Sequence, residues 1–220
     1  MCWNPDISLN TFLFACFGLA FIWVANTFTK YKSSLFENNK LIYVFFFATA
    51  AMQLVEFFLW KNLKNAASNT FWSKIASFVI VVQQVTLMLL IPSPEIRKNM
   101  LLLYAVFLGS FFLYKKIFSP IRFYTTVAKN GHLSWDWLGF KGYEIIWMVI
   151  SLLFYILPLY FIQNTTMLFF ITILLIASLF LYFKDGTFGT VWCWASNFSL
   201  LYFIVDILLI QPFYEYNGLC

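Results

Sequence analysis

The sequence predicts an all-α integral membrane bundle of about seven transmembrane helices, and two observations carry this prediction. Of the 220 residues, 62% are hydrophobic and only 10% are charged, whereas soluble domains have about 45–50% apolar and about 25% charged residues. Long apolar stretches also recur along the whole chain, with short segments between them. A water-soluble core cannot contain this much apolar surface, so we expect a single transmembrane domain over residues 1–220.

Seven apolar segments are long enough to cross a bilayer, whose hydrocarbon core of about 30 Å needs about 17–25 residues of helix. The expected spans are residues 9–27, 41–60, 75–91, 100–118, 145–162, 166–183 and 189–210. The fourth is the weakest, because its purely apolar part ends at Lys115 and Lys116, and without it six spans remain. We expect the first span to be retained, because residues 1–8 lack the basic start of a secretory signal.

The connector between the fourth and fifth spans, residues 115–143, is the one that is long enough to hold structure of its own. It mixes aromatic with basic residues, a composition typical of the headgroup level of a membrane. We therefore expect a short interfacial helix there, with His132, Trp135 and Trp137 as an interfacial motif. A lone loop histidine without neighbours of ligand type is more often a hydrogen-bonding residue than a metal ligand.

Basic residues in the loops predict the orientation of the chain. Nine Lys and Arg residues lie on the side of the amino terminus and five on the opposite side. Because cytoplasmic loops carry the excess of positive charge, the amino terminus is predicted to be cytoplasmic and, with seven spans, the carboxyl terminus lies outside.

Polar side chains inside the spans are the candidate functional residues, because each is costly to place in lipid. The candidate ligand or ion path consists of Gln53, Glu56, Trp60, Gln83, Gln84, Asn197 and Asp206. Gln53, Glu56 and Trp60 are spaced three and then four residues apart, which places them on one face of a helix. We expect this face to point into the bundle.

These polar groups allow more than one interpretation. The amides of the second, third and seventh spans lie at similar depth, so they would either form a substrate site or hold the helices together. Glu56 and Glu144 both lie near the inner end of their helices and would form a proton or cation relay if they approach each other. Alternatively, each sits at the interface near a lysine. Asp206 lies near the outer end, too far from Glu56 to pair with it.

This chain lacks the residues that several classes of membrane protein need for their chemistry. One histidine and four cysteines without paired spacing argue against a zinc-dependent hydrolase and a bis-histidine haem protein. No lysine lies in the middle of a span, which argues against covalent retinal, and Ser110 has no membrane histidine to activate it. We therefore predict a non-enzyme without metal or cofactor. The expected partners are membrane lipids, with a homo-oligomer or a membrane complex as further options, and no nucleic acid, because the basic residues are scattered.

Four fragments carry a resemblance: Met1-Cys2-Trp3-Asn4, MQLVEFFLW at 52–60, GHLSWDW at 131–137 and GTVWCWASN at 189–197. Together they resemble a family of small polytopic membrane proteins from giant DNA viruses and their algal or protist hosts. The resemblance places Glu56, Trp60, His132, Trp192, Cys193 and Asn197 on motif positions. It implies a small multi-pass membrane protein and assigns no roles.

The leading functional hypothesis is a channel or transporter that binds or passes a small solute or ion within the bundle, along Glu56, Gln53, Gln84 and Asn197. Two alternatives stay open: a structural or assembly protein of a viral or organellar membrane complex, and a receptor-like seven-helix bundle, which only the number of helices favours.

Overall fold

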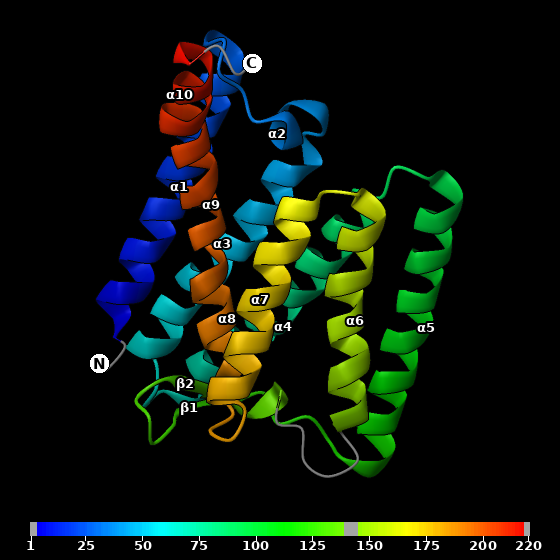
Figure 1. The fold of residues 1–220 in the computed structure, drawn as a ribbon. Coiled ribbons are helices and arrows are strands. Elements are labelled where there is room, and N and C mark those ends of the chain that lie inside the picture. Colours follow the sequence, from blue (N-terminus) through cyan, green and yellow to red (C-terminus); the bar gives the residue numbers. More distant parts are fainter. Residues whose placement is uncertain (1–3, 139–144, 218–220) are drawn as a thin grey trace.

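A computed structural model of the chain describes residues 4–138 and 145–217, and this part is an all-α bundle (Figure 1). Seven helices in it are long and apolar enough to cross a membrane. Six of them are α1 (Pro5–Phe28), α3 (Leu41–Lys61), α4 (Ala66–Leu89), α5 (Pro94–Phe118), α6 (Ile145–Ile162) and α7 (Thr165–Tyr182). The seventh, Phe188–Tyr216, consists of α8 (Phe188–Ser196), α9 (Phe198–Val205), the π-helical segment η3 (Asp206–Ile210) and α10 (Gln211–Tyr216).

All seven predicted spans are therefore confirmed as helices, including the uncertain fourth. Four of them begin earlier than their apolar parts, because polar residues cap them. The side chains of Asn4, Asn65, Ser93 and Asn164 each accept a hydrogen bond from a backbone N–H of the first turn of α1, α4, α5 and α7. Such caps satisfy donors that a helix start leaves without a partner. A count of apolar residues misses these polar first turns.

The two ends of the bundle differ. Helix α1 begins at the end that carries the strands β1 (Thr125–Val127) and β2 (Leu133–Trp135), and α10 lies at the opposite end with the short helix α2 (Ser34–Asn38), as an odd number of spans requires (Figure 1). We call these the hairpin end and the α2 end. Which of them faces the cytoplasm stays a prediction from the basic residues.

The expected interfacial helix is wrong for the described part of the connector, residues 119–138. Here β1 (Thr125–Val127) pairs antiparallel with β2 (Leu133–Trp135), and the short 3-10 helix η1 (Asp136–Leu138) follows. The reason is local: the strands join through Asn130 and Gly131, and Gly131 has φ of 81°. The N–H of Gly131 donates to the carbonyl of Ala128 over 2.9 Å, and a turn followed by a glycine of positive φ is a common three-residue hairpin connection. Residues 139–144 lie outside the described part.

The core near the α2 end is filled by aromatic rings. Phe36 of α2 is 1% exposed, and its ring centroid lies 5.4 Å from that of Phe46 in α3 and 5.2 Å from that of Phe203 in α9. Close to this cluster α1 approaches α9 at Gly18, where a Cβ atom would lie 3.2 Å from Cδ1 of Ile204. The bundle is thus closed toward the α2 end by tight apolar packing.

Candidate functional site

The centre of the candidate site is a pair of polar side chains on α3. Gln53 and Glu56 are both 0% exposed, and Trp60 is half-buried against the core. Glu56 precedes Lys61, the last residue of α3, by five positions, which is about 7.5 Å along the helix axis. The carboxyl group therefore lies inside the bundle, close to the hairpin end.

Neither side chain has a hydrogen-bonding partner among the described residues. Both carboxyl oxygens of Glu56 and both polar atoms of the Gln53 amide are buried without one. The electrostatic neighbours of the carboxyl group are Thr190 and Gln53, which lie near it without normal hydrogen-bond geometry, and Cys193. The described ion pairs, Lys30 with Glu215 and Lys32 with Glu37, lie at the α2 end. Among the described residues Glu56 is therefore not paired with a lysine, and its position relative to the membrane interface stays a prediction.

The β-hairpin holds the facing helix α8 in place. Thr190 of α8 donates its hydroxyl hydrogen to the backbone carbonyl of Leu133 in β2, over 2.9 Å. Leu133 is fully buried, and Trp135 of the same strand is 3% exposed. The hairpin thus covers the end of the bundle to which Glu56 lies closer.

Asn69 anchors the hairpin to α4. Its amide group donates to the carbonyl of Thr125 and accepts from the N–H of Thr125, each over 2.9 Å. The hydroxyl groups of Ser73 and Thr125 lie 2.8 Å apart. All three residues are fully buried, so these bonds satisfy groups that have no access to water.

A small cavity adjoins the Glu56 site on the side of α6. It has a volume of about 50 Å³ and is lined in part by Trp135, Tyr155, Trp192 and Cys193. About 10–15 Å³ of such volume is enough for one water molecule. The indole N–H groups of Trp135 and Trp192 have no hydrogen-bonding partner in the described structure, so polar donors are available beside this space.

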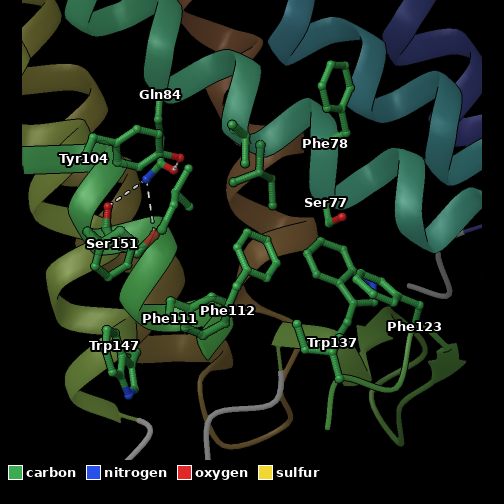
Figure 2. A pocket seen from close by; sticks show the side chains of 15 residues that line it. Ser77, Phe78, Gln84, Tyr104, Phe111, Phe112, Phe123, Trp137, Trp147 and Ser151 are labelled. Atoms are coloured by element: carbon green, nitrogen blue, oxygen red, sulfur yellow. Dashed lines mark hydrogen bonds between the residues drawn. The ribbon is translucent and has the colours of Figure 1, made fainter. Parts of the chain in front are cut away.

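The adjacent amides Gln83 and Gln84 point to different parts of the bundle. Gln83 points toward α3 and α6: its NH₂ group donates to the carbonyl of Ala48 and its oxygen accepts from the hydroxyl of Tyr155. Gln84 points toward α5, where Tyr104 donates to its oxygen and its NH₂ group donates to Ser151 (Figure 2). Successive residues of a helix point about 100° apart, which separates the two glutamines.

Asn197 lies between α8 and α9, at a local irregularity of the last span where the backbone keeps helical angles (φ −67°, ψ −20°). Its NH₂ group donates back to the carbonyl of Cys193 over 3.0 Å, and Ser196 donates to the same carbonyl. Asn197 also lines a 220 Å³ surface hollow next to α1, together with Asn10 and Trp194. Its side-chain oxygen is buried without a partner. Side chains that bond backbone carbonyls in this way compensate for the lost helical bonds.

Asp206 begins the π-helical segment η3, which approaches the α2 end. Its carboxylate accepts a hydrogen bond from Gln211 over 2.7 Å. The Gln211 amide also accepts from the backbone N–H of Lys32 and donates to the backbone carbonyl of Lys32. Asp206 is thus part of the closure at that end and is separate from Glu56. Glu144, the suggested relay partner of Glu56, lies outside the described residues.

The interfacial motif belongs to the hairpin. The rings of Trp135 and Trp137 stack with centroids 5.2 Å apart, and the ring of His132 lies edge-on to Tyr182, 5.4 Å away. His132 is 5% exposed. Burial lowers the pKa of its imidazole, and Asp185 opposes this effect.

This lowered pKa predicts how stability depends on pH. Because the unfolded chain takes up a proton on His132 more readily than the folded chain, stability is present above the unfolded value of about 6.5 and falls as the pH drops below it. The His132→Gln variant is expected to lose this part of the pH dependence. Thermal unfolding in detergent between pH 5 and 8 measures it, and an identical profile for both proteins would contradict the prediction.

Sequence reasoning missed Asn69, Tyr155 and Thr190. Asn69 falls before the predicted third span, Thr190 is weakly polar and Tyr155 lies in an apolar run, so none stood out. Trp192 and Cys193 entered only through the resemblance. In the described ranges no three His, Cys, Asp or Glu side chains lie together as a metal site requires.

Comparison of the chain with protein-family models, with curated proteins and with solved structures finds no match.

Proposed function

We propose that this multi-pass membrane protein binds and passes protons through its helical bundle, and that Glu56 is the group that carries the proton. The observation that supports this most is the buried carboxyl group of Glu56, which has no ion-pair or hydrogen-bond partner in the described structure. An ionised carboxylate at such a place is costly without a cation. The site therefore holds either a proton or a bound positive ion.

The composition of the site favours a proton over a metal cation. The polar side chains that act on the Glu56 carboxyl group are those of Gln53 and Thr190, each with a single oxygen atom. Ca²⁺ takes about six to eight oxygen ligands, and Mg²⁺ needs an octahedral set. A proton needs only the carboxyl group and a neighbouring donor or acceptor, which the Gln53 amide and water in the 50 Å³ cavity would provide.

Passage requires a movement, because apolar packing closes the site on both sides. Phe36, Phe46 and Phe203 fill the core toward the α2 end, and Leu133 and Trp135 cover the hairpin end. The 3-10-type turn at Asn197, where the N–H of Asn197 donates to the carbonyl of Trp194 and the N–H of Leu200 donates to the carbonyl of Asn197, supplies an element that can move, since a stretch of 3-10 geometry inside a helix often marks a hinge. In this proposal the two parts of the last span open the site alternately.

The experiment that tests the proposal is proton flux into liposomes that contain the purified protein, measured with an entrapped pH dye across imposed pH gradients and voltages. Protein-free liposomes serve as the control. We expect a proton flux well above the control and no comparable flux of K⁺. A folded, monodisperse protein that is silent under all conditions would contradict the proposal and favour an assembly role.

The proposal includes the remaining expectations from the sequence. In it the chain is not an enzyme, uses no cofactor and has a cytoplasmic amino terminus. Membership of the resembling viral and protist family stays a proposal as well.

A further inference from the structure

A second cavity, separate from Glu56, lies between α4, α5, α6 and the connector. Its volume is about 320 Å³, and eight of its 15 lining residues are aromatic. Figure 2 shows Phe111, Phe112 and Trp147 on one side and Phe123 and Trp137 on the other. We call this space the aromatic cleft.

The cleft exists because α5 packs closely only near its start. Of the 25 residues of this helix, the structure buries Met100, Tyr104 and Lys115. Between Tyr104 and Lys115 no residue of α5 is buried, although Phe107, Phe111 and Phe112 line the cleft. Protein interiors are close-packed, and side chains beside a void lose contacts. Because α5 is a candidate membrane span, we expect an acyl chain of a surrounding lipid to supply these contacts.

The polar groups of Gln84, Ser151 and Tyr104 at one end of the cleft already have hydrogen-bonding partners. The NH₂ group of Gln84 donates to the carbonyl and the hydroxyl oxygen of Ser151, and its oxygen accepts from Tyr104. These groups therefore satisfy one another. The part of a ligand that lies against these groups is thus expected to be a hydrocarbon. The indole N–H of Trp137, another lining residue, is buried without a hydrogen-bonding partner in the described structure, so one donor remains beside this hydrocarbon.

Positive charges surround the cleft at the hairpin end. Lys74, Lys116 and Arg122 are exposed, and the ammonium group of Lys74 lies 6.0 Å from the ring of Phe123, a lining residue. Arg122 stands between the lining residues Ile121 and Phe123, and Lys116 follows the lining residue Phe112 by one helical turn. One exposed acidic residue, Asp136, adjoins Trp137, so the charge of this group stays positive.

We propose that the aromatic cleft binds one anionic phospholipid of the leaflet at the hairpin end. An acyl chain fills the cavity, and the phosphate lies among Lys74, Lys116 and Arg122. Basic groups beside clefts between transmembrane helices suit acidic headgroups, most of all on the cytoplasmic side, which the positive-inside pattern assigns to this end. The inference is independent of proton passage.

The test is native mass spectrometry of the protein released from nanodiscs of phosphatidylcholine with phosphatidylglycerol in equal amounts. We expect one retained phosphatidylglycerol per chain. The variant Leu108→Trp places a large ring in the cleft and is expected to reduce retention by about tenfold. Its matched control is Leu113→Trp, because Leu113 lies on the same helix, is 59% exposed and does not line the cleft.

A second variant tests the headgroup without touching the cavity. The triple change Lys74→Gln, Lys116→Gln and Arg122→Gln is expected to remove the preference for phosphatidylglycerol by about tenfold or more. The control carries Lys30→Gln, Lys40→Gln and Lys98→Gln at the α2 end. No retained lipid, equal retention of phosphatidylcholine, or equal loss in the control variants would overturn the proposal.

Discussion

The Glu56→Gln variant is expected to lose proton flux by about 100-fold or more, while it folds at least as stably as the wild type. Proton transfer by a positioned side chain typically contributes about 10²–10⁴-fold, and glutamine keeps the shape of the side chain but cannot release a proton. Because the change removes an ionisable group from a buried site without a partner, the free energy of unfolding should stay the same or rise by about 1 kcal/mol. Liposome flux and unfolding in detergent measure the two effects.

Two further variants make this result specific. Glu95→Gln changes an exposed carboxylate in the first turn of α5, and we expect it to leave the flux unchanged and to cost at most about 0.5 kcal/mol of helix-dipole stabilisation. Glu56→Asp keeps a carboxyl group and should retain part of the flux. If Glu56→Gln conducts as well as the wild type, or if Glu95→Gln loses flux equally, Glu56 is not the proton carrier.

The Asn69→Ala variant is expected to lower the free energy of unfolding by about 2–4 kcal/mol, because it leaves the N–H and the carbonyl of Thr125 buried without a partner. It should also loosen the hairpin from α4. Among the described side-chain hydrogen bonds, those of Asn69 and Ser73 to Thr125 are the ones that join β1 to α4. Trypsin cleavage after Lys129, an exposed residue of the hairpin loop, should then become faster.

Asn99→Ala provides the matched control for this stability effect. Asn99 is exposed on α5, so its loss should change stability by no more than about 0.5 kcal/mol. Equal stability of the two variants, or unchanged cleavage after Lys129, would show that Asn69 does not anchor the hairpin.

The local sequence was enough to predict some limits of the helices, whereas other limits and the hairpin were missed. The end of α6 at Ile162 agrees with the end of the apolar run, and the residue that follows, Gln163, has a positive φ of 59°. The start of α4 at Ala66 was missed because Asn65 caps a turn that is not apolar. The hairpin was missed although Asn130-Gly131 signals it, because aromatic and basic residues suggested an interfacial helix instead.

For the site, the spacing of Gln53 and Glu56 was enough to place them on one helical face, and the structure buries both completely. Their lack of partners was not visible in the sequence. Nor was the separation of Gln83 from Gln84, or the role of Thr190 in joining α8 to the hairpin. Each of these depends on how a helix is rotated and which neighbour it meets.

The sequence by itself determined that the described part of this chain forms seven helices long and apolar enough to cross a membrane, because hydrophobic length measured against bilayer thickness is a property of each segment alone. Only the tertiary structure decided that Glu56 lies unpaired beside α8 and that an aromatic cleft opens beside α5. Contacts between residues far apart in the chain depend on the mutual rotation and spacing of helices, and in lipid these are set by side-chain packing that no single segment contains.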